Sequence, residues 1–235
     1  MFATFRMRVA RLLSIPALVL VALASIGAVP VARAADAPAA ANPAAANEDG
    51  LVQATVKGVD RVLQRPGTDW ASYTKVLVAP VEVSFSKSWN PRDYGSFGLK
   101  SSDVDRIRRD LSQMTYDIFT KVLGEGGYTI APTPAEGVLQ VRPNIVNLYI
   151  NAPDTMQAGR TRSYVVDAGE MTLALELRDS ITGTLLAQAR DRKRGTESGR
   201  VTLANSVVNR AEAERALRGW ATQLRTNLDA ARKAP

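Results

Sequence analysis

Carboxylates are the side chains in this sequence best able to carry acid–base chemistry, because the 235-residue chain contains no histidine and no cysteine. The missing histidine excludes a Ser-His-Asp triad and the usual zinc and copper sites, and the missing cysteine excludes thiolate nucleophiles. A pair of carboxylates can hydrolyse a glycosidic bond without either residue. Four acids are candidates for such a pair, and the sequence does not choose between them: Glu82, Asp167, Glu170 and Asp179.

The Ser-x-x-Lys motif occurs twice, at Ser72/Lys75 and at Ser84/Lys87. In serine acyl-transfer enzymes the lysine can deprotonate the serine when both side chains lie on one helix face. Ser84 and Lys87 fall at the end of a predicted strand, where residues three apart point to opposite faces. No Lys-Thr-Gly follows to complete the set. We therefore predict no catalytic residue at either position.

Two further motifs resemble ligand sites in composition only. The glycines at 124, 126 and 127 follow a predicted helix, whereas a phosphate loop precedes one, so they predict a helix end. Asp103 and Asp105 fall in the first turn of the same helix, where the helix dipole explains acids more simply than a metal does. The sequence therefore predicts no cofactor-binding residue and no metal ligand.

The segment from 147 to 169 is the most promising candidate for a binding site, because long loops held by rigid strands often carry function. A solvated hairpin end is the alternative interpretation. If the segment binds a partner, the residues around its tip would do so: Tyr149, Asn151, Asp154, Arg160, Arg162 and Tyr164.

A basic cluster near the end of a predicted strand has two interpretations. It consists of Arg190, Arg192, Lys193 and Arg194, with Asp191 inside it. The cluster could dock an anionic lipid headgroup or an acidic partner. We favour the alternative, that a charged strand end prevents edge-to-edge pairing.

The first 34 residues are typical of a secretory signal peptide. Three arginines (6, 8 and 11) precede an apolar run from Leu12 to Val29, and Ala32-Arg33-Ala34 resembles a cleavage site. No cysteine follows that could carry a lipid. We expect cleavage after Ala34, periplasmic residence and no stable membrane anchor. An uncleaved anchor is the alternative, since the run approaches the ~20 residues that span a bilayer.

Export also explains the basic composition. The leader contains four arginines and no acid, so the net charge of +7 falls to +3 once it is removed, with 26 basic and 23 acidic residues left. This small excess does not predict nucleic-acid binding. Residues 35–49 are rich in alanine and proline, which predicts a disordered spacer, and residues 50–232 are long enough for a single domain.

The remaining pattern predicts an α+β domain in which a mostly antiparallel sheet carries two long helices packed on one face. The helices are expected from about Ser102 to the glycines at 124–127 and from Asn209 to about Ala231. Proline within the second strand predicts an edge position or a bulge at Pro80. A slipped pattern predicts a bulge at 143–146. Strands are expected at 59–64, 75–85, 128–131, 138–150, 164–178 and 184–192.

Three stretches carry a resemblance to a known family. They are Pro66-Gly67-Thr68-Asp69 followed by YTKVLVAPVEVSFSKSW (73–89), NLYINAPDTMQAGRTRSYVVDAGEMTLALELRDSITG (147–183) and GWATQLRTNL (219–228). Together they resemble the bacterial exported family called domain of unknown function thirty-three-thirteen, over about residues 49–229. The resemblance implies an envelope location and no established activity. Many members resemble lipoproteins, but the missing cysteine means that a lipid anchor is not carried over.

These observations favour a periplasmic binding or accessory protein without catalytic activity. Its partner would be another envelope protein or an anionic envelope component. A carboxylate-dependent, glycosidase-like hydrolase acting on an envelope component is the alternative. A structural envelope protein without a discrete ligand is the third possibility.

Overall fold

The computed structural model describes residues 49–93, 99–150, 164–165, 169–194, 202–203 and 206–233. The predicted signal peptide and nearly all of the predicted spacer lie outside these ranges. Among the described residues, no helix is long and apolar enough to cross a membrane.

One eight-stranded sheet forms the centre of the domain, in the order β1-β2-β9-β8-β6-β3-β5 with β4 beside β6. Strands β1, β2, β9, β8 and β6 pair antiparallel, whereas β3 and β4 run parallel to β6 and β5 runs parallel to β3. The strands are β1 (Val52–Ala54), β2 (Arg61–Gln64), β3 (Lys75–Val78), β4 (Val83–Phe85), β5 (Thr129–Ile130), β6 (Val138–Tyr149), β8 (Glu170–Asp179) and β9 (Leu185–Arg194). A separate two-stranded sheet pairs β7 (Tyr164–Val165) with β10 (Thr202–Leu203).

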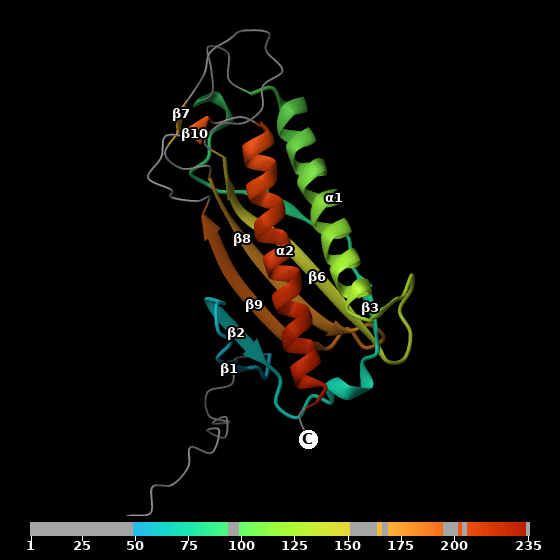
Figure 1. The fold of residues 1–235 in the computed structure, drawn as a ribbon. Helices are drawn as coiled ribbons and strands as arrows, with labels where there is room; N and C mark the ends of the chain where they lie inside the picture. The colour runs from blue at the N-terminus through green and yellow to red at the C-terminus, as the bar shows by residue number, and fades with distance from the viewer. Residues whose placement is uncertain are drawn as a thin grey trace, which may run out of the picture. The chain divides into compact units, whose positions relative to one another are not determined.

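Two long helices, α1 (Ser101–Glu125) and α2 (Ser206–Ala231), lie side by side across one face of the large sheet (Figure 1). The short helices η2 (Trp70–Ser72) and η3 (Pro91–Asp93) lie in connections. This arrangement confirms the predicted α+β class with a mostly antiparallel sheet and two helices on one face.

The core fills the space between the helices and the sheet. Leu173, Leu175 and Leu177 of β8 face inward at alternate positions, as their spacing predicts. Phe119 of α1 and Leu217 of α2 are fully buried against them. Burying a side chain of this size stabilises a fold by about 1.5–3 kcal/mol, so the two helical stripes are what hold the layers together.

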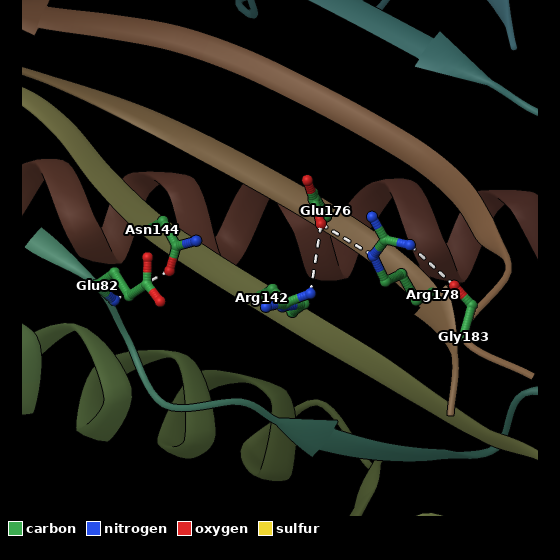
Figure 2. Close-up of polar contacts among 6 residues, drawn as sticks. All are labelled: Glu82, Arg142, Asn144, Glu176, Arg178 and Gly183. Carbon is green, nitrogen blue, oxygen red and sulfur yellow. Dashed lines mark hydrogen bonds and ion pairs between the residues drawn. The ribbon is translucent and has the colours of Figure 1, made fainter. Parts of the chain in front are cut away.

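The predicted strand at 75–85 is two strands, because the ladder is interrupted around Pro80. Proline has no backbone N–H to donate, and Ala79 makes the last bond of the first part, to the Val141 carbonyl (2.8 Å). The N–H of Glu82 then bonds to the side-chain oxygen of Asn144 (3.0 Å), and β4 resumes the pairing (Figure 2). The predicted edge position is confirmed at Pro80 itself because, among the described strands, β5 pairs only with Lys75 and Val76 at the start of β3, and β4 pairs with β6 alone.

The irregularity in β6 lies later than the sequence predicts. Pro143 to Val146 pair in register with β8, and the register shifts only between Val146 and Tyr149. Asn147 adopts a φ of 54° there, in the left-handed region that asparagine tolerates better than most residues. Pro143 lacks a backbone N–H, yet it stays in register with its side chain in the core. For this reason the sequence pattern places the bulge too early.

Candidate functional site

The face of the sheet opposite the two helices is mostly polar, apart from a small buried cluster of Leu51, Leu63 and Leu185 near β1 and β2. We call it the open face. Directly paired residues share a face, so the register places Arg61, Arg190, Ala174 and Asn144 in one row across β2, β9, β8 and β6. Neither α1 nor α2 packs on this face (Figure 1). The polar and small residues of the open face are Arg61, Arg142, Asn144, Glu170, Ala174, Glu176, Arg178, Gln188, Arg190, Arg192 and Arg194. The register also places Leu63, Val146, Tyr149 and Thr172 on this face, each buried or half-buried.

Glu176 is shared by two arginines at the centre of the open face. Its carboxylate lies 2.9 Å from Nε of Arg178 and 3.8 Å from a terminal nitrogen of Arg142 (Figure 2). Arg178 also donates to the carbonyl of Gly183 (2.9 Å), so its guanidinium is fixed between strand and turn. Arg142 keeps 42% of its side chain exposed and only this longer contact with the acid. Arg142 therefore retains free donors.

Glu170 is shared in the same way near the other end of β8. Its carboxylate lies 3.0 Å from Nε of Arg194 and 3.7 Å from a terminal nitrogen of Arg192. Both arginines keep 51% of their side chains exposed. Each of the two open-face acids therefore balances two arginines, which leaves positive charge in excess.

Arg61 and Arg190 face each other across β2 and β9, and both are exposed. Within the described ranges, neither guanidinium has an ion pair or hydrogen bond. Like charges placed directly opposite on neighbouring strands are destabilising. With this pair the open face carries six arginines and two glutamates, a net charge of +4.

A buried carboxylate fixes the arginine-bearing part of β9 from below. Asp191 is 3% exposed and accepts hydrogen bonds from the indole N–H of Trp220 (2.7 Å) and the backbone N–H of Asp60 (3.1 Å). Lys193 pairs with the same carboxylate at 2.9 Å. The Asp60 carboxylate accepts the N–H of Arg192 in return (3.0 Å). These bonds tie β2, β9 and α2 together where the backbone pairing of β2 has ended.

The predicted basic cluster is thus divided between two faces. Alternation along β9 places Arg190, Arg192 and Arg194 outward, whereas Asp191 and Lys193 point inward. Because β2 pairs with β9 only as far as Arg190, the charged residues beyond it do lie along an unpaired stretch of strand. This position is compatible with the interpretation that the charged end of β9 prevents edge-to-edge pairing with another strand.

The structure describes only part of the predicted partner-binding segment. Tyr149 is half-buried at the end of β6, opposite Glu170, and Tyr164 lies in β7, where only the backbone is described. The indole N–H of Trp89 bonds to the Ile150 carbonyl (3.1 Å) and its ring stacks on Phe85, which fixes the start of the segment. The other candidates, Asn151, Asp154, Arg160 and Arg162, lie outside the described residues. The binding role of this segment stays a prediction.

The candidate catalytic acids are not brought together. Asp179 closes the β8–β9 turn, accepting the N–H groups of Ile181 and Thr182 and the Tyr73 hydroxyl (3.0 Å). Glu170 lies about 30 Å away at the other end of β8 and binds arginines. Glu82 is exposed beside Asn144, and Asp167 lies outside the described residues. Among the described acids, no pair of candidates lies free in a cleft.

The pKa shifts in this turn have structural causes. Hydrogen bonds from Thr182 hold the pKa of Asp179 below its usual value. Burial, reinforced by the hydrogen bond to Asp179, raises the pKa of Tyr73 to about 12. The lowered pKa keeps Asp179 charged as a hydrogen-bond acceptor, and the raised pKa keeps Tyr73 neutral as its donor.

The remaining motifs have the structural roles that the sequence favours. Gly127 follows α1 with a φ of 90°, which confirms the glycines as its end. Asp103 and Asp105 pair with Arg106 (3.5 Å) and Arg108 (2.8 Å) on their own helix. In the part of the chain that is described, no group of three or more acidic side chains is placed so that it could hold a metal ion. Neither Ser-x-x-Lys pair lies on one helix, since Lys75 begins β3 and Ser84 lies in β4.

A shallow groove of about 310 Å³ separates the outer sides of α1 and α2. Met114 and Ile118 form its apolar part. Its charged residues come from both helices, and Arg210 already pairs with Glu214 at 3.2 Å. The mixed charges give this groove no preference for a ligand of one sign, in contrast to the open face.

The chain belongs to the family described as "Protein of unknown function (DUF3313)", which matches residues 43–224. This confirms the resemblance found in the sequence. No match was found among curated proteins.

Two solved structures are similar at low identity. The PelC dodecamer from Paraburkholderia phytofirmans is 16% identical, with 70% of this chain and 96% of that chain covered and a TM-score of 0.35. Protein XCC0632 from Xanthomonas campestris, of the DUF330 family, is 16% identical, with coverages of 73% and 89% and a TM-score of 0.38. These similarities are too distant to support an argument about function.

Proposed function

We propose that this chain is an exported, non-catalytic binding or accessory protein of the cell envelope, and that it binds its partner through the open face. The observation that carries the proposal is the charge of that face, where six arginines surround two shared glutamates. Guanidinium groups bind carboxylates and phosphates through paired hydrogen bonds. The partner is therefore an anionic envelope component or an envelope protein with an acidic surface.

The described carboxylates give the hydrolase alternative no support. Glycosidases hold their two acids about 5–10 Å apart around the scissile bond. Here Glu170 is paired with arginines and Asp179 is used in a turn. A binding role needs no such pair and uses the residues that the open face does present.

Export is supported by the leader sequence, with its arginines, apolar run and Ala32-Arg33-Ala34 exit. Expression of the full chain in a Gram-negative host, followed by fractionation and N-terminal sequencing, tests this part. We expect a periplasmic product that begins at Ala35. A product that keeps Met1 and stays with the inner membrane would contradict cleavage.

Binding is tested by capture from detergent-free envelope fractions on the immobilised wild-type protein and two charge-matched variants. Arg61→Gln/Arg190→Gln removes two open-face charges that have no described partner. Arg109→Gln/Arg218→Gln removes two exposed charges from the helices. We expect an envelope component that the wild type and the helix variant capture equally and the open-face variant loses. Equal capture by all three proteins would overturn the role of the open face.

A further inference from the structure

We propose that the open face docks peripherally on a membrane surface rich in anionic phospholipid. This inference rests on the proposed function and names its partner. The arginines are spread rather than convergent. The strands that carry Arg61 and Arg142 are three inter-strand steps apart, about 14 Å, and Arg190 to Arg194 spans about 13 Å along β9. A single small anion would contact few of these groups, whereas a layer of phosphates meets all of them.

The open face also lacks the apolar anchors that a protein partner would use. Interface hot spots are rich in buried Trp and Tyr as well as Arg. The aromatic residue that the register places on this face, Tyr149 opposite Glu170, is half-buried, and Ile181 in the β8–β9 turn is the exposed large apolar side chain among the described residues. Attraction to this surface is therefore electrostatic, and it does not require insertion into the bilayer.

The pair Arg61 and Arg190 is the best-suited phosphate site on this face. The two residues are opposite each other, exposed and without a described partner, so a phosphate between them would relieve their repulsion. The bonds of Asp60 and Asp191 hold β2 against β9 at this point. The pair is thus positioned before the phosphate arrives, which reduces the entropy lost on binding.

Negative charge at the two margins sets the orientation of the docking surface. Glu82 is exposed beyond Asn144 at the β4 side, and Asp60, also exposed and bonded to the Arg192 N–H, lies at the β2 side. Four of the six open-face arginines lie on β2 and β9, so the positive charge is concentrated over these two strands. Arg190→Gln should weaken docking more than Arg142→Gln, because Arg142 lies nearer Glu82 and contacts Glu176.

Vesicle flotation tests the proposal with the exported protein purified from the periplasm. The probes are vesicles of phosphatidylglycerol with phosphatidylcholine and vesicles of phosphatidylcholine alone, at low and at raised salt. A basic residue near an anionic bilayer contributes about fivefold to affinity, so Arg61→Gln/Arg190→Gln should bind the anionic vesicles about 25-fold more weakly. The helix variant Arg109→Gln/Arg218→Gln should bind like wild type, and raised salt should release the protein.

The remaining outcomes distinguish a failure of membrane docking from a failure of the proposed binding function. No binding to anionic vesicles, together with an envelope component captured through the open face, would overturn membrane docking and keep the binding role. Soluble poly-glutamate that binds as tightly as the vesicles, with the same loss in the open-face variant, would likewise overturn it, because any polyanion would then suffice. Failure of vesicles, polymer and capture together would overturn both.

Discussion

Asp191 and Trp220 are joined by a 2.7 Å hydrogen bond between the carboxylate and the indole N–H, although the chain places them on a strand and a helix. Both side chains are buried, at 3% and 3% exposure. The bond lies directly beneath the arginines of β9 and links α2 to the strand that carries them.

Asp191→Ala should destabilise the protein by about 2–4 kcal/mol, because it leaves the indole N–H, the Asp60 N–H and the Lys193 ammonium without their acceptor. Urea unfolding measures the loss. Trp220→Phe keeps most of the packing and removes one of these bonds, so it should cost less. A loss below about 0.5 kcal/mol in Asp191→Ala, as for an ordinary surface change, would contradict the assigned role.

The hydrogen bond between Tyr73 and Asp179 predicts a loss of stability at high pH. The folded pKa of Tyr73, about 12, is above its ordinary value of 10.0, so its contribution is complete below pH 10 and is lost as the pH rises towards 12. Unfolding of wild type and Tyr73→Phe between pH 9 and 12 checks this. The variant should lose less stability over that window, and parallel curves would refute the prediction.

Asp179 gives the opposite dependence at low pH. Its pKa is lowered in the fold, so its contribution is present above the unfolded pKa, about 3.9, and is lost as the pH falls through the lower folded pKa. Asp179→Asn should therefore show a shallower acid loss than wild type. Acid unfolding followed by circular dichroism measures the difference, and identical acid midpoints would contradict it.

Gly169→Ala should destabilise the protein by about 1–3 kcal/mol, because the residue has a φ of 121° and a Cβ there would collide with the Tyr149 carbonyl oxygen. Gly219→Ala is the matched control: it lies within α2 with open space around the added methyl, and it should stabilise by about 0.5–1 kcal/mol. Equal effects at the two positions in thermal unfolding would argue against the close approach.

The sequence predicted those features that local periodicity encodes. The alternation of Leu173, Leu175 and Leu177 gave the inward face of β8, and the Asp179–Gly183 turn gave the hairpin with β9. The parallel place of β3 between β6 and β5 was not predictable in this way, since strand order depends on contacts between distant segments.

The open face could not be predicted from the sequence, because it too depends on contacts between distant segments. Arg190, Arg192 and Arg194 were visible as a basic cluster, but the alternation that removes Lys193 and Asp191 from it becomes decisive only once β9 has a defined inner face. Arg61 is 129 positions before Arg190, and only the β2–β9 register brings the two together. The acids of the cluster, Glu170 and Glu176, come from another strand again.

The most direct test of the central claim asks which face of the protein contacts isolated envelope membranes. Because the chain has no cysteine, Gln188→Cys on the open face and Gln113→Cys on α1 each provide a single site for a fluorescent label. We predict that the membranes shield the label at 188 from a soluble quencher and leave the label at 113 accessible. Shielding at 113 alone, or equal shielding at both positions, would contradict binding through the open face.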